Sequence, residues 1–346
     1  MRAVQLTAPR TPVVDANIPR PDIGPDDVLV RIRAAGICHS DVHYRGGKSR
    51  VEPLPLTLGH EVAGEIEAVG ANVPASRIGE RVALHYLVTC GGCDWCINDR
   101  EMFCDKALML GHFTDGGWAE YIAVPSRNAV VLPDNVPFEH GAIMMCSSAT
   151  SLHALRQGQM TVGARVLVIG AGGLGMSAIQ LAQILGARQV LAVDRDAGKL
   201  ALAARYGAVT VQAGASVSPE DLVSAVMDAT QNAGVDVVLD LVAHESTVTL
   251  GIAVAAPRGR VVIVGINDRP LPVDTYRGLI GREVTLVGSN DHTLRELEEL
   301  MGYAADGRLR LHDVVAATVP LDAAAINGVL DALERGQAPT RTVVVP

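Results

Sequence analysis

The sequence predicts an α/β protein in which a doubly wound parallel sheet is combined with a second, mostly β domain. From about residue 165 onward, short runs rich in Val, Ile and Leu alternate with helical segments, as in parallel sheets covered on both faces. Before about residue 148, short alternating runs are interrupted by Gly and Pro, which indicates β structure. The 346 residues exceed the size at which one hydrophobic core usually stops growing, so we expect two domains.

The parallel sheet is expected to begin with a strand at residues 165–169, which runs directly into a glycine-rich turn. Gly170 permits the tight turn, Gly172 lets the backbone approach a pyrophosphate, and Gly175 lets the next helix pack close to the sheet. Between a strand and a helix, this pattern predicts dinucleotide binding. The complete G-x-G-x-x-G turn is Gly170, Ala171, Gly172, Gly173, Leu174 and Gly175.

The end of the next strand, residues 189–193, carries information on which dinucleotide binds. Asp194 follows this strand, about 20 residues beyond the turn, where a carboxylate accepts hydrogen bonds from the ribose hydroxyls of NAD(H). It also repels the additional phosphate of NADP, so NADP is less favoured. Arg195 supports the opposite preference if it pairs with that phosphate; alternatively, it is a solvated surface charge. The alternating pattern continues with a helix at 199–206 and strands at 235–241 and 260–266.

Composition limits the classes of function. The formal net charge of −9 argues against nucleic-acid binding, which needs a basic surface. The longest apolar stretch, residues 166–187, contains five glycines and two glutamines, and the strand and turn explain it better than a membrane span. The first residues show no apolar signal core, so we expect a cytoplasmic protein whose six cysteines are reduced thiols or metal ligands.

Four cysteines lie close together with the spacing Cys90-x2-Cys93-x2-Cys96-x7-Cys104. Four thiolates at this spacing can converge on one tetrahedral Zn2+ without ligands from distant parts of the chain. Such a closed site supports structure and leaves no coordination position for a substrate. The competing interpretation is a surface disulfide.

A second, open zinc site is available from Cys38, His60 and Cys146, with Glu61 beside His60. Three protein ligands leave one position on a tetrahedral zinc for water or a substrate oxygen. Zinc there acts as a Lewis acid, either lowering the pKa of an alcohol or polarising a carbonyl, so the sequence does not choose the direction of reaction. Taken singly, Cys146 is also compatible with a small core residue and His60 with a structural histidine.

Together the motifs resemble the zinc-dependent medium-chain alcohol dehydrogenases over essentially the whole chain, and the resemblance supports the three-ligand assignment. It implies a Rossmann domain inserted in a mostly β GroES-like catalytic domain, and a reaction that interconverts an alcohol and its aldehyde or ketone with NAD(H) and two Zn2+ per chain. The implied domains are a catalytic domain with the structural zinc lobe at 1–148, an NAD-binding domain at 149–284, and a segment returning to the catalytic domain at 285–346. The motifs that carry the resemblance are 36–43, 58–64, the four cysteines, Cys146 before 150–155, and 170–175.

The resemblance also implies roles for residues around the open zinc. Asp41 orients the His60 imidazole, since a ligand imidazole needs its other N–H satisfied. Glu61 is the carboxylate beside the metal. Ser40 and His43 resemble a proton relay, with His43 as the outer base; the alternative interpretation makes Ser40 a helix cap and His43 a surface residue.

Cofactor and substrate contacts are implied in the same way. The residues expected to bind the cofactor, besides Asp194, Arg195 and the turn with Gly173 and Leu174, are His39 and Arg341 at the pyrophosphate, Thr150 and Lys199. The residues expected to line the substrate pocket are Tyr86, Trp118 and Met109 or Leu110, with His85 near that wall. His292 stands where relatives commonly have glycine, so the shape of their pocket is not transferred to this chain.

Two rival functions remain at this stage. The nearer one is a polyol or threonine dehydrogenase on the same scaffold, although polyol enzymes commonly replace the third thiolate by Glu and this chain has Cys146. The farther one is a zinc-free NADPH reductase or a nucleotide-binding sensor, against which an intact open zinc site argues. We expect a small-molecule substrate, no nucleic-acid or membrane partner, and a homodimer or homotetramer formed through the edge strand at 283–287.

Overall fold

The computed structural model describes residues 1–267, 269–271 and 273–346, which form two compact units. Unit 1 comprises residues 1–149, 293–307 and 311–346, and unit 2 comprises residues 150–292 and 308–310. The chain therefore leaves unit 1 after α3 (Phe138–Ile143) and η4 (Met144–Ser148) and returns to it at the start of α9 (Leu294–Ala305).

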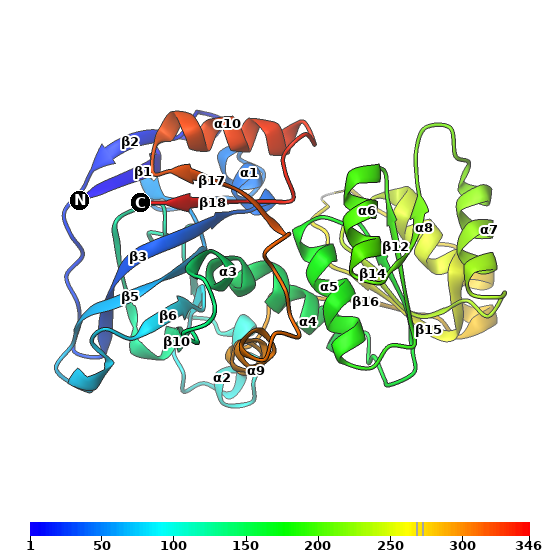
Figure 1. Ribbon diagram of the computed structural model, residues 1–346, viewed down its shortest axis with the longest axis horizontal. Helices are drawn as coiled ribbons and strands as arrows, with labels where there is room; N and C mark the ends of the chain where they lie inside the picture. Colours follow the sequence, from blue (N-terminus) through cyan, green and yellow to red (C-terminus); the bar gives the residue numbers. More distant parts are fainter. Residues whose placement is uncertain (268, 272) are drawn as a thin grey trace. The chain divides into compact units, whose positions relative to one another are not determined.

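Unit 1 is built around a seven-stranded sheet in the order β10-β6-β5-β3-β18-β17, with β9 also paired to β3 (Figure 1). Its long central strand β3 alternates buried apolar residues with charged ones, as expected for a strand with one face on the core. Only β17 and β18 among the described strands of this sheet run parallel. The strands are β3 (Asp27–Ile37), β5 (Glu61–Val69), β6 (Arg81–Leu84), β9 (Tyr121–Pro125), β10 (Ala129–Val131), β17 (Val315–Pro320) and β18 (Arg341–Val345).

Two small sheets and several helices complete unit 1. The small sheets are β2 (Val14–Asn17), β1 (Arg2–Leu6) and β4 (Leu56–Thr57), and the pair β7 (Leu87–Val88) and β8 (Leu108–Met109). The helices are α1 (His39–Arg45), α2 (Asp94–Ile97), α3 (Phe138–Ile143), α9 (Leu294–Ala305) and α10 (Ala323–Glu334), with the π-helical turn η4 (Met144–Ser148). The short 3-10 turns are η1 (Ala75–Arg77), η2 (Glu101–Phe103) and η3 (Ser126–Asn128).

Unit 2 contains a six-stranded parallel sheet in the order β13-β12-β11-β14-β15-β16, which confirms the predicted fold class. Figure 1 shows α5 and α6 on one side of this sheet and α7 and α8 on the other. The strands are β11 (Arg165–Ile169), β12 (Gln189–Asp194), β13 (Val209–Gln212), β14 (Val235–Asp240), β15 (Ala255–Ile263) and β16 (Thr285–Gly288). The helical segments are α4 (Ala149–Gln157), α5 (Gly173–Ile184), α6 (Ala197–Arg205), α7 (Pro219–Ala229), α8 (Glu245–Val254), η5 (Thr275–Leu279) and η6 (Ile280–Arg282).

The end of the parallel sheet differs from the prediction. The strand expected at 260–266 is β15, which begins earlier and ends at Ile263. The boundary expected at residue 284 is wrong, because β16 pairs with β15 and belongs to unit 2, which continues to His292. The predicted edge strand begins later than expected, since Glu283 has a left-handed backbone (φ 52°) that interrupts extended structure.

The apolar stretch at 166–187 forms β11, the glycine-rich turn and α5. Among the described residues, no helix combines the length and the apolar character needed to cross a membrane.

Candidate metal and cofactor sites

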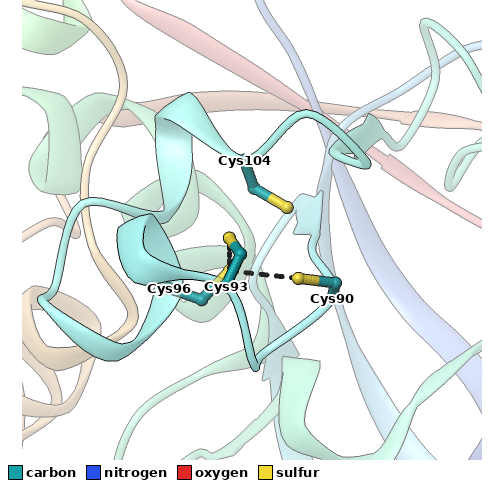
Figure 2. Close-up of side chains that lie close together, drawn as sticks. All are labelled: Cys90, Cys93, Cys96 and Cys104. Carbon is teal, nitrogen blue, oxygen red and sulfur yellow. Dashed lines mark hydrogen bonds between the residues drawn. The ribbon is translucent and has the colours of Figure 1, made fainter.

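The four cysteines at 90–104 face one another in a loop that carries α2 and η2 (Figure 2). Their sulfur atoms all lie within 4.8 Å of one another, with Cys93 Sγ 3.5 Å and Cys90 Sγ 3.9 Å from Cys96 Sγ. Two sulfurs on a tetrahedral Zn2+ with Zn–S bonds of about 2.3 Å are about 3.8 Å apart. All six cysteines of the chain are free thiols, so the competing disulfide interpretation is wrong.

The electrostatics of this loop favour an ionised sulfur. The backbone N–H groups of Gly92 and Cys93 donate toward Cys90 and lower the pKa of its thiol to about 6. Thiolates are the form that binds zinc, so the donor set fits the metal by chemistry as well as by spacing.

A second donor set consists of Cys38, His60, Glu61 and Cys146, whose ligand atoms lie within 4.8 Å of one another. Three segments bring it together: Cys38 joins β3 to α1, His60 and Glu61 lie at the start of β5, and Cys146 lies in η4. All four residues are buried, and Nε2 of His60 has no hydrogen-bond partner among the described residues. A buried ring nitrogen that has no hydrogen-bond partner and lies beside two thiols fits the role of a metal ligand.

The two thiols of this set contact each other. Their sulfur atoms are 4.0 Å apart, and the hydrogen bond between them, with His60 nearby, lowers the pKa of Cys38 well below its usual value. The same pairing, together with burial, raises the pKa of Cys146 well above its usual value. Two adjacent buried thiolates repel each other, so ionisation of both requires a cation between them.

Asp41 lies behind the His60 ring, as the sequence predicts for a residue that orients the imidazole. Its fully buried carboxylate places Oδ1 3.4 Å from His60 Nδ1, and Oδ2 accepts the backbone N–H of Cys38 at 2.8 Å. One carboxylate thus contacts two residues of the donor set. The residue that caps α1 is Cys38, so the interpretation of Ser40 as a helix cap is wrong.

Arg341 forms an ion pair with Glu61 that the sequence did not indicate. The guanidinium Nη2 of Arg341 donates to Oε2 of Glu61, and both side chains are buried. Strands β5 and β18 flank β3 on opposite sides, and Gly36 of β3 pairs with Glu61 and with Val343. A Cβ at Gly36 would overlap the Glu61 carboxylate, so the glycine leaves the space in which the ion pair forms.

Burial raises the pKa of Glu61 to about 7, and Arg341 limits this rise. The sequence motifs predict that Arg341 contacts the cofactor pyrophosphate. In unit 1 its guanidinium pairs with Glu61, which is itself a member of the metal donor set. A glycine inside a strand often marks the close approach of another group, and Gly36 in β3 is such a glycine, although it does not identify Arg341 as the partner of Glu61.

The other predicted residues of α1 surround Cys38. Ser40 Oγ lies 3.8 Å from Cys38 Sγ, and the rings of His39 and His43 meet edge to face at 5.1 Å. His39 is exposed, whereas Ser40 and His43 are half-buried. These three side chains are therefore more exposed than the neighbouring Cys38.

In unit 2 the glycine-rich turn has the geometry that its sequence predicts. Gly170 has a positive φ of 98°, and a Cβ at Gly175 would lie 2.0 Å from the Gly170 carbonyl oxygen. A Cβ at Gly172 would meet no atom within 4 Å, so space is open above this backbone. Asp194 Oδ2 accepts the N–H of Ala171 at 2.7 Å, which brings the acidic residue to the turn.

The remaining predicted cofactor residues are less closely tied to the turn. Thr150 is half-buried near the start of α4, where the neighbouring Ser151 donates to the Leu174 carbonyl at 2.8 Å. Arg195 is exposed, and the backbone N–H of Lys199 donates to Asp196 at 3.0 Å.

The predicted wall residues lie at different depths around His60. The Tyr86 ring meets the His60 ring edge to face at 5.5 Å, and Met109 Sδ accepts from the Tyr44 hydroxyl at 3.5 Å. Leu110 and Trp118 are fully buried in the core of unit 1.

His85 is also deeply buried. Burial, aided by the charge of Arg127, lowers the pKa of His85 to about 3, so the ring is neutral near pH 7. Its Nε2 lies 3.8 Å from the Glu101 carboxylate, which accepts the N–H of Leu294 at the start of α9.

Comparison with known proteins agrees with this combination of sites. The family model described as alcohol dehydrogenase GroES-like domain matches residues 24–134, and that described as zinc-binding dehydrogenase matches residues 173–305. The chain is 34% identical to an NAD-dependent alcohol dehydrogenase of Sulfurisphaera tokodaii over 100% of both chains. It is 32% identical to an L-threonine 3-dehydrogenase of Bacillus licheniformis over 88% of each chain.

Solved structures give the same result. The alcohol dehydrogenase from the hyperthermophilic archaeon Aeropyrum pernix is similar with a TM-score of 0.88 and 33% sequence identity, and the alignment covers 100% of both chains.

Proposed function

Because the chain belongs to the zinc-dependent medium-chain dehydrogenase/reductase family, we propose that this oxidoreductase interconverts an alcohol and its aldehyde or ketone with hydride transfer to or from NAD(H). The observation that carries the proposal is the buried set of Cys38, His60 and Cys146 in unit 1, in a chain whose unit 2 has the dinucleotide-binding turn. Three ligands leave a tetrahedral metal open to a substrate oxygen.

We assign one zinc to Cys38, His60 and Cys146 and a second to the four cysteines at 90–104. The first supplies Lewis acidity toward the oxygen of an alcohol or a carbonyl, and the bound nicotinamide carries the hydride. The second holds its loop and, with four protein ligands, has no position for substrate. The convergence of each donor set supports this assignment.

The protein residues around the first site hold it and move a proton. Asp41 fixes the orientation of the His60 ring through Nδ1, leaving Nε2 toward the metal. Ser40, next to the Cys38 sulfur, and His43, one helical turn farther along α1, form the proposed route by which the hydroxyl proton reaches solvent. Arg341 offsets the charge of Glu61 beside the donor set.

For the cofactor we propose NAD(H) rather than NADP(H). Asp194 reaches the turn through its bond to the Ala171 N–H, and its carboxylate is therefore near the position of an adenosine ribose. Arg195 is exposed. We propose further cofactor contacts from their places in the sequence motifs, namely Arg195, Lys199, Thr150, His39 and Arg341.

A threonine or polyol dehydrogenase is the second candidate, because relatives named L-threonine 3-dehydrogenase are about as similar to this chain as the alcohol dehydrogenases. Cys146 favours the alcohol dehydrogenase over the polyol enzymes, which commonly have Glu as the third ligand. A panel of simple alcohols, L-threonine and polyols, assayed by NADH absorbance, separates these substrates.

The function depends on the first zinc and the stability of the loop on the second. We predict that Cys38→Ser abolishes turnover with a small effect on melting temperature, whereas Cys104→Ser lowers the free energy of unfolding by several kcal/mol, because structural zinc binding is coupled to folding. Turnover by NADH absorbance and melting by calorimetry are measured on both variants. Equal losses of melting temperature, with turnover retained in Cys38→Ser, would contradict this division.

Asp194→Ala tests the choice of cofactor. Loss of a hydrogen bond to a charged group costs about 1.5–3 kcal/mol, so we predict that the preference for NAD over NADP falls by roughly tenfold or more. Removal of the carboxylate also relieves repulsion of the NADP phosphate and leaves Arg195 available to it. Steady-state kinetics with both cofactors measure the ratio. A wild type that prefers NADP, or an unchanged ratio in the variant, refutes the assignment.

We further propose that the chain forms a dimer or tetramer through β16. This strand is an edge of the parallel sheet in the described part of the chain, with β15 on its other side, and such edges are usually covered. Sedimentation at micromolar concentration is expected to show a species larger than one chain, and a monomer would end this proposal.

A further inference from the structure

A groove of about 910 Å³ lies in unit 1 beside the loop that follows α1. Its lining combines this loop with Leu108 and Phe113, whose side chains are large, apolar and substantially exposed. Exposed apolar side chains that line a hollow are a common feature of ligand sites. The lining residues that bear on ligand binding are Lys48, Arg50, Glu52, Leu54, Leu108 and Phe113.

The polar lining of the groove is basic, although the chain as a whole carries a net charge of −9. Arg50 pairs with Glu52, since Nη2 and Oε1 are 2.6 Å apart. Lys48 forms no ion pair with any residue that the structure describes. The groove thus combines an apolar wall with one uncompensated ammonium group, and the complementary ligand has an apolar body and an anionic end.

The groove is close to the proposed catalytic site. Phe113 contacts the His112 ring at a centroid distance of 4.1 Å, His112 stacks on Tyr44 at 4.4 Å, and Tyr44 lies 6.3 Å from the His60 ring. The backbone N–H of Lys48 donates to the carbonyl of His43 at 3.0 Å, which anchors the basic residue to α1. Tyr44 and His112 therefore connect the groove lining to His60 through a continuous series of ring contacts.

We propose that this groove binds the remote end of the substrate, and that the substrate is an alcohol or carbonyl compound with an apolar chain ending in a carboxylate or a phosphate. Lys48 pairs with the anion, and Leu54, Leu108 and Phe113 contact the chain. This inference rests on the proposed function and names the substrate class of that same site. Because Lys48 does not touch the reacting atoms, it contributes to substrate binding and specificity rather than to the chemical step.

The experiment compares hexanol with ω-hydroxyhexanoate and ω-hydroxyhexyl phosphate, using wild type, Lys48→Met and Lys48→Arg. We expect Lys48→Met to lower kcat/KM for the better anionic substrate by about tenfold, mainly through KM, since a charge-assisted contact of this kind has about that strength. Hexanol is expected to change by less than about twofold, and Lys48→Arg to retain most of the anion preference. The anion with the larger loss identifies the natural terminal group.

Two controls separate a specific contact from general effects of charge. Lys106→Met removes a lysine from unit 1 outside the groove and is expected to leave the anion preference unchanged. Added salt is expected to reduce the preference of the wild type and to have little effect in Lys48→Met, because the partly exposed ion pair is screened.

The outcomes distinguish this inference from the function on which it rests. Turnover of hexanol with no preference for either anion, or an equal loss for all three substrates in Lys48→Met, overturns the groove assignment and leaves the dehydrogenase intact. If none of the alcohols is turned over, the proposed function fails in its present form. Calorimetric titration with hexanoate then tests whether the groove binds an apolar anion. Binding to wild type that is lost in Lys48→Met supports the groove assignment, and absence of binding to wild type overturns it.

Discussion

The structure of unit 1 depends on how it compensates several ionisable groups buried at one point. Cys38, His60, Glu61 and Cys146 are joined there by Asp41 and Arg341, and each is almost inaccessible to water. Burial of this many charges is costly unless each is paired. Arg341 offsets Glu61 and Asp41 faces His60, so it is the ionisation of both thiols that requires an added cation.

The backbone provides these pairings through the order of the strands. Because β3 lies between β5 and β18, residues from the beginning and the end of the chain flank the same strand. Gly36 then leaves the space in which Glu61 and Arg341 meet. The C-terminal segment therefore completes the charge balance of the site, which gives a physical reason for the chain to return to unit 1 after the parallel sheet.

Local patterns were sufficient to predict much of this arrangement. The glycine-rich turn was predictable because its glycines are required by local geometry. Gly170 has a positive φ, and Gly175 allows the helix to pack close to the turn. The four cysteines were predictable for the same reason, since their convergence needs no distant chain. The grouping of Cys38, His60 and Cys146 came from their joint occurrence in family motifs, because their spacing alone does not bring them together.

Interactions between distant segments were not predictable. The pair of Glu61 and Arg341 spans 280 positions, and nothing near either residue indicates the other. The boundary near residue 284 was wrong because β16 is held by pairing with β15, which short-range hydrophobic patterns do not reveal. The groove beside Lys48 likewise depends on Leu108 and Phe113, which lie about 60 positions further along the sequence, after the loop of four cysteines.

The most direct measurement of the central claim, that two separate donor sets each hold a metal, is the zinc content of carefully purified native protein by mass spectrometry. We predict two zinc ions per chain, because both sets have their ligands within reach of one ion. We also predict one zinc per chain after substitution of either Cys38 or Cys104. A native wild-type preparation that contains one zinc per chain, or none, would contradict the assignment of two metal sites.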